Sequence, residues 1–138
     1  MITHTVNTVF SSGMTFTSDI NGHDVVMDTT ADDGGNDSGP SPKRLMLASL
    51  AGCTGMDVVS ILNKMKVAFN KFSINIHASL TAEHPKTYNY VKITYRIKVA
   101  EADKTKMGKA VTLSQDKYCG VSAMFRAFAK IDTEIDFL

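Results

Sequence analysis

The chain has 138 residues, of which 43% are hydrophobic and 21% charged, and its formal net charge is +1. This length and composition are typical of one globular domain, and we predict a single domain over residues 1–138. A charge so close to zero, without a run of basic residues interleaved with aromatics, argues against nucleic acid as a partner.

The N-terminal segment lacks the basic region and the long apolar core of a signal peptide. No uncharged apolar stretch is long enough for a membrane span, because Asp57 and Lys64 interrupt the most apolar segment. We therefore expect a cytoplasmic protein without a membrane partner. In that compartment the two cysteines are expected to be reduced or catalytic rather than a structural disulfide.

The N-terminal region predicts three antiparallel strands in a meander. Residues 2–10 alternate weakly between apolar and polar side chains, and residues 14–20 and 24–29 form two further strand-like runs. Between the last two runs, Asn21-Gly22 is a strong signal for a two-residue hairpin turn.

A loop and a long helix follow the meander. Residues 31–41 are rich in Gly and Asp and predict a loop, and Ser41-Pro42 then predicts the start of a helix that runs to about Lys66. Apolar side chains lie almost all round this helix, more than one small sheet can cover. We therefore predict a second copy of the chain against it, a homodimer, with a short helix packed on top as the alternative.

Two strands with clean alternation come next, over residues 73–80 and 91–99, and they predict a hairpin with one wet face. A helix over about residues 104–114, a break at DKYCG, a short helix and a closing strand complete the chain. The last two elements cover residues 121–130 and 131–137. Strands, then a helix, then strands again predict an α+β fold.

Each cysteine occupies a distinctive place in this pattern. Cys53 lies in the middle of the apolar helix, where a small buried and inert side chain is the ordinary interpretation. Cys119 comes just before a predicted helix start, where backbone N–H groups favour a thiolate. Two such thiols suit peroxide chemistry, in which one becomes a sulfenic acid and the other condenses with it. Their spacing alone leaves open whether they meet.

The segments around both cysteines resemble the OsmC/Ohr family of osmotically inducible and organic hydroperoxide resistance proteins. The resemblance lies in Gly39-Pro40-Ser41-Pro42 followed by LMLASLAGCTGMDVVSIL, and in KYCGVSAMF around Cys119. It implies an intertwined α+β homodimer with its sites at the subunit interface. It also implies thiol-dependent reduction of organic hydroperoxides in oxidative-stress defence, with Cys53 peroxidatic, Cys119 resolving, and an external dithiol reductant in place of a bound cofactor.

The chain departs from the family pattern in its charged residues. Family members flank the reactive thiol with an Arg from the N-terminal β region and a Glu at the start of the central helix. Here residues 1–43 contain no Arg, and Lys43 occupies the Glu position. Arg44 and Arg126 are the candidate activating cations, with ordinary surface charge as the alternative for each. These departures keep open a catalytically degenerate protein that binds a small hydrophobic ligand at the dimer interface.

Asp57 stands one helical turn after Cys53, and a carboxylate there raises the pKa of the thiol if the two are close. The histidines show no metal-ligand spacing, so we predict neither a zinc site on them nor any bound metal. They are His4, His23, His77 and His84. His23 as the partner of a cysteine hydrolase, and a hot-dog thioesterase fold, are the competing interpretations.

Overall fold

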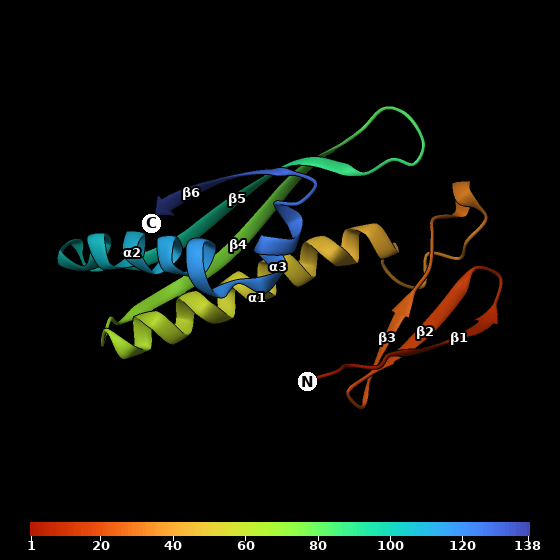
Figure 1. Ribbon diagram of the computed structural model, residues 1–138, viewed down its shortest axis with the longest axis horizontal. Coiled ribbons are helices and arrows are strands. Elements are labelled where there is room, and N and C mark those ends of the chain that lie inside the picture. The colour runs from red at the N-terminus through yellow and green to blue at the C-terminus, as the bar shows by residue number, and fades with distance from the viewer. The chain divides into compact units, whose positions relative to one another are not determined.

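The chain, described over residues 1–138 by a computed structural model, divides into two units, Met1–Met46 and Leu47–Leu138. Each unit contains its own three-stranded sheet (Figure 1). The predicted mixture of helices and strands is confirmed as an α+β fold with a long central helix. That the two units behave as one domain stays a prediction.

The first unit contains an antiparallel meander in the order β1-β2-β3. Its strands are β1 (Asn7–Ser12), β2 (Thr15–Ile20) and β3 (His23–Met27). The predicted hairpin turn is confirmed, because Asn21 and Gly22 have φ angles of 53° and 82°, the left-handed pair that a tight hairpin needs. The first strand is shorter than predicted, because the weak alternation before Asn7 belongs to exposed, non-strand chain.

One buried carboxylate organises the loop after β3. Asp28 is 3% exposed and accepts hydrogen bonds from the backbone N–H groups of Thr29, Asn36 and Ser38 and from the hydroxyls of Thr15 and Ser38. The Ser38 hydroxyl, followed by the Thr29 N–H, holds the pKa of this carboxyl well below its usual range. The predicted loop is therefore tied down at one end, and it contains the short 3₁₀ turn η1 (Ala31–Asp33).

The central helix α1 (Pro42–Lys64) begins at the proline that predicted its start. It ends two residues earlier than expected, because Lys66 adopts a left-handed φ of 59° that stops the helical path. Its fully buried side chains recur every four residues and form one stripe. They are Leu50, Thr54, Val58 and Leu62.

The second sheet has the order β4-β5-β6. Strands β4 (Phe69–Leu80) and β5 (Tyr88–Val99) form the predicted antiparallel hairpin. The closing strand β6 (Lys130–Phe137) pairs with β5 in parallel, so the chain between them crosses over a face of the sheet. The sequence predicted the closing strand but not its direction.

The crossover between β5 and β6 consists of four short elements. They are η2 (Glu101–Asp103), α2 (Lys104–Leu113), the π-helical turn η3 (Ser114–Tyr118) and α3 (Gly120–Phe125). The predicted break at DKYCG is thus largely helical, and the last helix ends at Phe125 instead of near Lys130. Only Cys119 stands between η3 and α3 in extended backbone.

Helices α1 and α2 lie on the same face of the second sheet (Figure 1). The inward side chains of β5 are completely buried beneath them. These are Val91, Ile93, Tyr95 and Ile97. Gly55 fits this packing, since a Cβ atom there would lie 3.0 Å from the Ile74 side chain of β4. Gly55 therefore allows a close approach of α1 to β4 within the chain.

By length and composition α1 also meets the criterion for a membrane-crossing helix, with a mean hydropathy of 1.7 over its most apolar window. Only 22% of that window is buried. The core helix of a soluble protein meets the same criterion, so the expected absence of a membrane partner stays a prediction.

Candidate functional site

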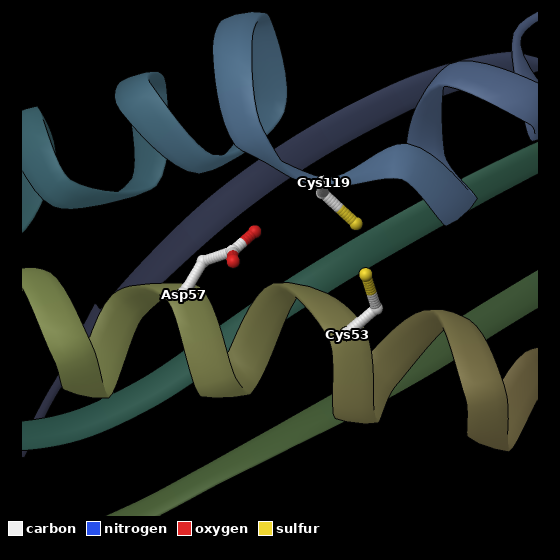
Figure 2. Close-up of side chains that lie close together, drawn as sticks. All are labelled: Cys53, Asp57 and Cys119. Atoms are coloured by element: carbon white, nitrogen blue, oxygen red, sulfur yellow. The ribbon is translucent and has the colours of Figure 1, made fainter. Parts of the chain in front are cut away.

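The second unit brings the two cysteines together. Cys53 lies midway along α1 and Cys119 follows η3, and both are free thiols. Their Sγ atoms and a carboxylate oxygen of Asp57 all lie within 4.8 Å of one another. Figure 2 shows the two sulfurs pointing toward each other across the gap between α1 and the η3–α3 segment. Cys119 is buried, at 3% exposure, whereas Cys53 is only partly buried.

The π-helical turn sets the position of Cys119. The Cys119 N–H donates to the Ser114 carbonyl at 2.7 Å, one residue further back than in an α-helix, and such turns are frequent at functional sites. Cys119 then caps α3, and its Sγ accepts hydrogen bonds from the Ser122 backbone N–H at 3.3 Å and the Ser122 hydroxyl at 3.1 Å. The expectation that Cys119 precedes a helix start is confirmed.

A buried chain of hydroxyl groups runs beneath the thiols and ends on Asp57. Thr54 Oγ1 lies 2.6 Å from Tyr95 Oη and 2.8 Å from Ser114 Oγ, and the Ser114 hydroxyl donates to Asp57 Oδ2 at 3.0 Å. Because the Ser114 hydrogen is used on the carboxylate, Thr54 must donate to Ser114, and Tyr95 must donate to Thr54. Each hydroxyl hydrogen in this series therefore points toward Asp57.

Gln115 joins the hydroxyl series to Cys119. Its Nε2 atom lies within 3.1–3.2 Å of three oxygens, those of Thr54, Tyr95 and Ser122, and Ser122 donates to Cys119 Sγ. Arg126 fixes the amide orientation, since its guanidinium donates to the Gln115 backbone carbonyl at 2.7 Å and to Oε1 at 2.8 Å. Every buried side-chain polar atom of the protein has a hydrogen-bond partner.

The predicted activating cations have different places. Arg126 reaches Cys119 through Gln115 and Ser122 and is therefore a positioning residue in this arrangement. Arg44 belongs to the first unit, at the start of α1, and its part in activating Cys53 stays a prediction. The histidines are all exposed, and none belongs to the cluster around the thiols.

The electrostatic surroundings of Cys53 favour the neutral thiol. Burial raises the pKa of Cys53, Cys119 and the Asp57 carboxylate raise this pKa further, and only the Val121 backbone N–H lowers it. The pKa of the Tyr95 phenol is also raised, chiefly by burial. What a reactive thiolate needs in addition is a positive charge.

Two grooves flank α1 within the second unit. One, of about 300 Å³, is lined by Asp57, Ile61, Leu113 and Tyr118 among others and opens beside the thiol cluster. The larger, of about 740 Å³, runs between α1 and β4 and is lined mostly by apolar residues, together with Ser60, Asn63 and Ser73. Of the three residues of the cluster, Asp57 lines the smaller groove, and neither cysteine lines either groove.

The sequence profile of the OsmC-like protein family matches residues 34–134, most of the chain and both cysteine segments. The chain belongs to this OsmC-like family. The family resemblance predicted from the two cysteine segments is thus confirmed. The OsmC-like match extends across the unit boundary, from the loop before α1 into β6.

Relatives of this OsmC-like chain include Protein YhfA of Escherichia coli strain K12, which is 28% identical over 120 residues, covering 86% of the chain and 87% of YhfA. A crystal structure of a hypothetical protein from Aquifex aeolicus VF5 has a TM-score of 0.86 and 28% identity, covering 100% and 98% of the two chains. An organic hydroperoxide resistance protein OsmC from Legionella pneumophila has a TM-score of 0.69 at 15% identity, covering 99% and 98%, and shares the fold.

Five buried polar residues of the site were not identified from the sequence: Thr54, Tyr95, Ser114, Gln115 and Ser122. Two of them carried a signal. Thr54 falls on the four-residue stripe of α1, and Tyr95 falls on the inward face of β5, so each places a hydroxyl where only carbon is expected. Ser114, Gln115 and Ser122 carried none, because their burial depends on the π-helical turn and on the short helix α3 that follows it.

Proposed function

We propose that the protein is a thiol-dependent peroxidase that reduces organic hydroperoxides, with Cys53 as the attacking thiol and Cys119 as the resolving thiol. The observation that carries the proposal is the convergence of both free sulfurs within 4.8 Å. Cys53 is the more accessible of the two, whereas Cys119 is buried beside it. Membership of the OsmC-like family and the fold shared with the Legionella hydroperoxide resistance protein support the same chemistry.

The proposed cycle has two steps. In the first, the Cys53 sulfur attacks the terminal peroxide oxygen, an S–O bond forms, the O–O bond breaks, and the thiol proton leaves with the alcohol product. In the second, the Cys119 sulfur attacks the sulfenic acid, the disulfide forms and water leaves. The two thiols lose the two electrons that the hydroperoxide gains, and an external dithiol returns them.

The resting site holds Cys53 mainly as a thiol, because burial and the neighbouring acidic groups raise its pKa. We therefore expect the oxidation rate to increase with pH as the thiolate fraction grows. Arg44 of a second copy is the proposed source of additional positive charge, since Arg44 is the basic residue nearest in sequence to Cys53 and Arg126 is engaged with Gln115.

We also propose that the protein is a cytoplasmic homodimer without nucleic acid or membrane partners. The apolar groove between α1 and β4 and the 76% exposed side chain of Met56 support a second copy over this face. The same groove supports the alternative function, in which a small hydrophobic ligand binds at the dimer interface. Analytical ultracentrifugation of the reduced protein tests the dimer, and a monomer at micromolar concentration contradicts it.

Stoichiometric oxidation tests the peroxidase. One equivalent of tert-butyl hydroperoxide, added to the reduced, chelator-treated protein, should consume both thiols and yield a Cys53–Cys119 disulfide by peptide mass spectrometry. Cys119→Ser should stop at a sulfenic acid on Cys53 that dimedone traps. In the matched Cys53→Ser variant, Cys119 should survive the same treatment. If both thiols of the native protein survive excess hydroperoxide, the proposal fails and ligand binding becomes the leading function.

A further inference from the structure

Three potential metal ligands converge at the thiol cluster. They are the sulfurs of Cys53 and Cys119 and a carboxylate oxygen of Asp57, all within 4.8 Å of one another (Figure 2). We propose that the reduced cluster is a metal site that binds one divalent cation of the zinc class through the two thiolates and the carboxylate. The proposal does not depend on peroxidase activity, because it concerns the reduced protein alone.

The separation of the three ligand atoms fits a tetrahedral site. With metal–sulfur bonds of about 2.3 Å and metal–oxygen bonds of about 2.1 Å, neighbouring ligand atoms lie roughly 3.5–3.8 Å apart. The three ligand atoms lie within 4.8 Å of one another, so small side-chain rotations bring them to these separations. Cys53 and Asp57 are four residues apart on α1, the spacing that brings two helical ligands to one metal. Cys119 supplies the third ligand from the opposite segment.

The fourth position and the entry route come from the groove beside Asp57. This groove, of about 300 Å³, reaches the carboxylate from outside. Three protein ligands with an open fourth position is an arrangement that leaves room for water on the metal. The partly buried Cys53 lies one helical turn from Asp57, so the ligand set is not sealed in the core.

Each of the three ligands is already oriented by a donor. Asp57 accepts from Ser114 at 3.0 Å, Cys119 accepts from the Ser122 hydroxyl at 3.1 Å, and the Val121 backbone N–H bonds to Cys53. Donors of this kind fix ligand geometry and spread the negative charge of bound thiolates. The hydroxyl series behind Asp57 and the Gln115 amide behind Ser122 hold the donors in turn.

The charge of the cluster calls for a cation. Two thiolates and one carboxylate carry three negative charges when they bind, and none of the ion pairs of the protein involves Asp57. Arg126 is engaged with Gln115 instead. A divalent ion supplies the missing positive charge, and two sulfur ligands select zinc-class metals over magnesium or calcium.

Metal binding and disulfide formation exclude each other, because both use the same sulfur electron pairs. If the proposed peroxidase cycle operates, two metal-bound thiolates, one hydroperoxide and two protons yield the disulfide, an alcohol, water and the released metal ion. This coupling rests on the proposed function, whereas the metal site itself does not.

Cobalt titration tests the site. Full-length protein, reduced, demetallated and kept free of oxygen, is titrated with Co²⁺. We expect sulfur-to-cobalt charge-transfer bands that saturate at one ion per chain and disappear on addition of Zn²⁺. Cys53→Ser and Cys119→Ser should each lose part of the charge-transfer intensity. Asp57→Asn should keep both sulfur contributions but weaken binding by about tenfold to a hundredfold.

Asp116→Asn is the matched control, because Asp116 is an exposed carboxylate on η3 outside the cluster, and it should bind as the native protein does. Circular dichroism of every variant establishes that it is folded. Absence of charge-transfer bands while thiol counting finds both cysteines reduced overturns the proposal, as does undiminished affinity in Asp57→Asn. The peroxidase test is run without metal and this one without peroxide, so each proposal can fail by itself.

Discussion

Replacing Asp57 by Asn changes the charge beside Cys53 while keeping the shape of the side chain. The carboxylate oxygen and the Cys53 sulfur lie within 4.8 Å. At that distance two unit charges interact by about 3.5 kcal/mol at an effective dielectric constant near 20 and by about 0.9 kcal/mol in bulk water. Since Cys53 is partly exposed and Asp57 is the smallest of the influences that raise its pKa, the lower figure applies, and we expect Asp57→Asn to lower this pKa.

The assay uses a Cys119→Ser background, so that one thiol remains, in the presence of a chelator. The ultraviolet absorbance of the thiolate gives the pKa, and iodoacetamide alkylation at neutral pH gives the reactivity. A change of about 0.9 kcal/mol raises the thiolate fraction about fourfold. Because the thiolate also becomes less nucleophilic, alkylation should accelerate only about twofold. Asp116→Asn, which keeps Asp57, should behave as the parent.

An unchanged or higher Cys53 pKa in Asp57→Asn refutes the charge balance described for the site. The same variant is expected to bind metal more weakly, so one substitution moves thiol reactivity and metal affinity in opposite directions. Simple disruption of the fold does not produce that pair of results.

Three further predictions concern stability. Thr54→Val should lower the free energy of unfolding in urea by about 2–4 kcal/mol, because it leaves the hydroxyls of Tyr95 and Ser114 without their common partner; an equal loss in Thr54→Ser would argue against the hydrogen bonds. Leu62→Ala should cost about 2–5 kcal/mol in the same assay, since Leu62 is fully buried, and a loss below that range means the site collapses around the cavity. The Asp28 carboxyl has a folded-state pKa below its unfolded value of about 3.9, so its stabilisation is present above that pH and is lost on acidification. Asp28→Asn should therefore flatten the acid limb of the pH–stability curve, and parallel curves contradict this.

The elements that local chemistry specifies could be predicted from the sequence. Pro42 starts α1 because its fixed φ and missing N–H suit the first helical position. Asn21 and Gly22 turn the hairpin because both tolerate positive φ. The alternation of apolar and polar residues in β4 and β5 matches the alternation of more and less buried side chains in the structure, because one face of that sheet is covered.

Features that depend on distant partners could not be predicted. The parallel pairing of β6 with β5 is fixed by the path of the crossover rather than by any residue in β6. The π-helical turn has no residue signature, although it places Cys119 opposite Cys53. For Asp57 the sequence shows only its position one helical turn after Cys53. That spacing suits a carboxylate that raises the pKa of the thiol and equally one that binds a metal together with it.

Tyr95 gives the site a natural optical probe. The chain contains four tyrosines and no tryptophan, so no indole masks phenol absorbance or emission. The Tyr95 ring is sealed in the interior, and its hydrogen starts the series that ends on Asp57. Because hydrogen bonds in a chain polarise one another, a change of charge at the Asp57 carboxylate should change the strength of each bond in the series, including the bond that the Tyr95 hydroxyl donates. Difference spectra of the unlabelled protein will therefore follow events at the cluster in real time.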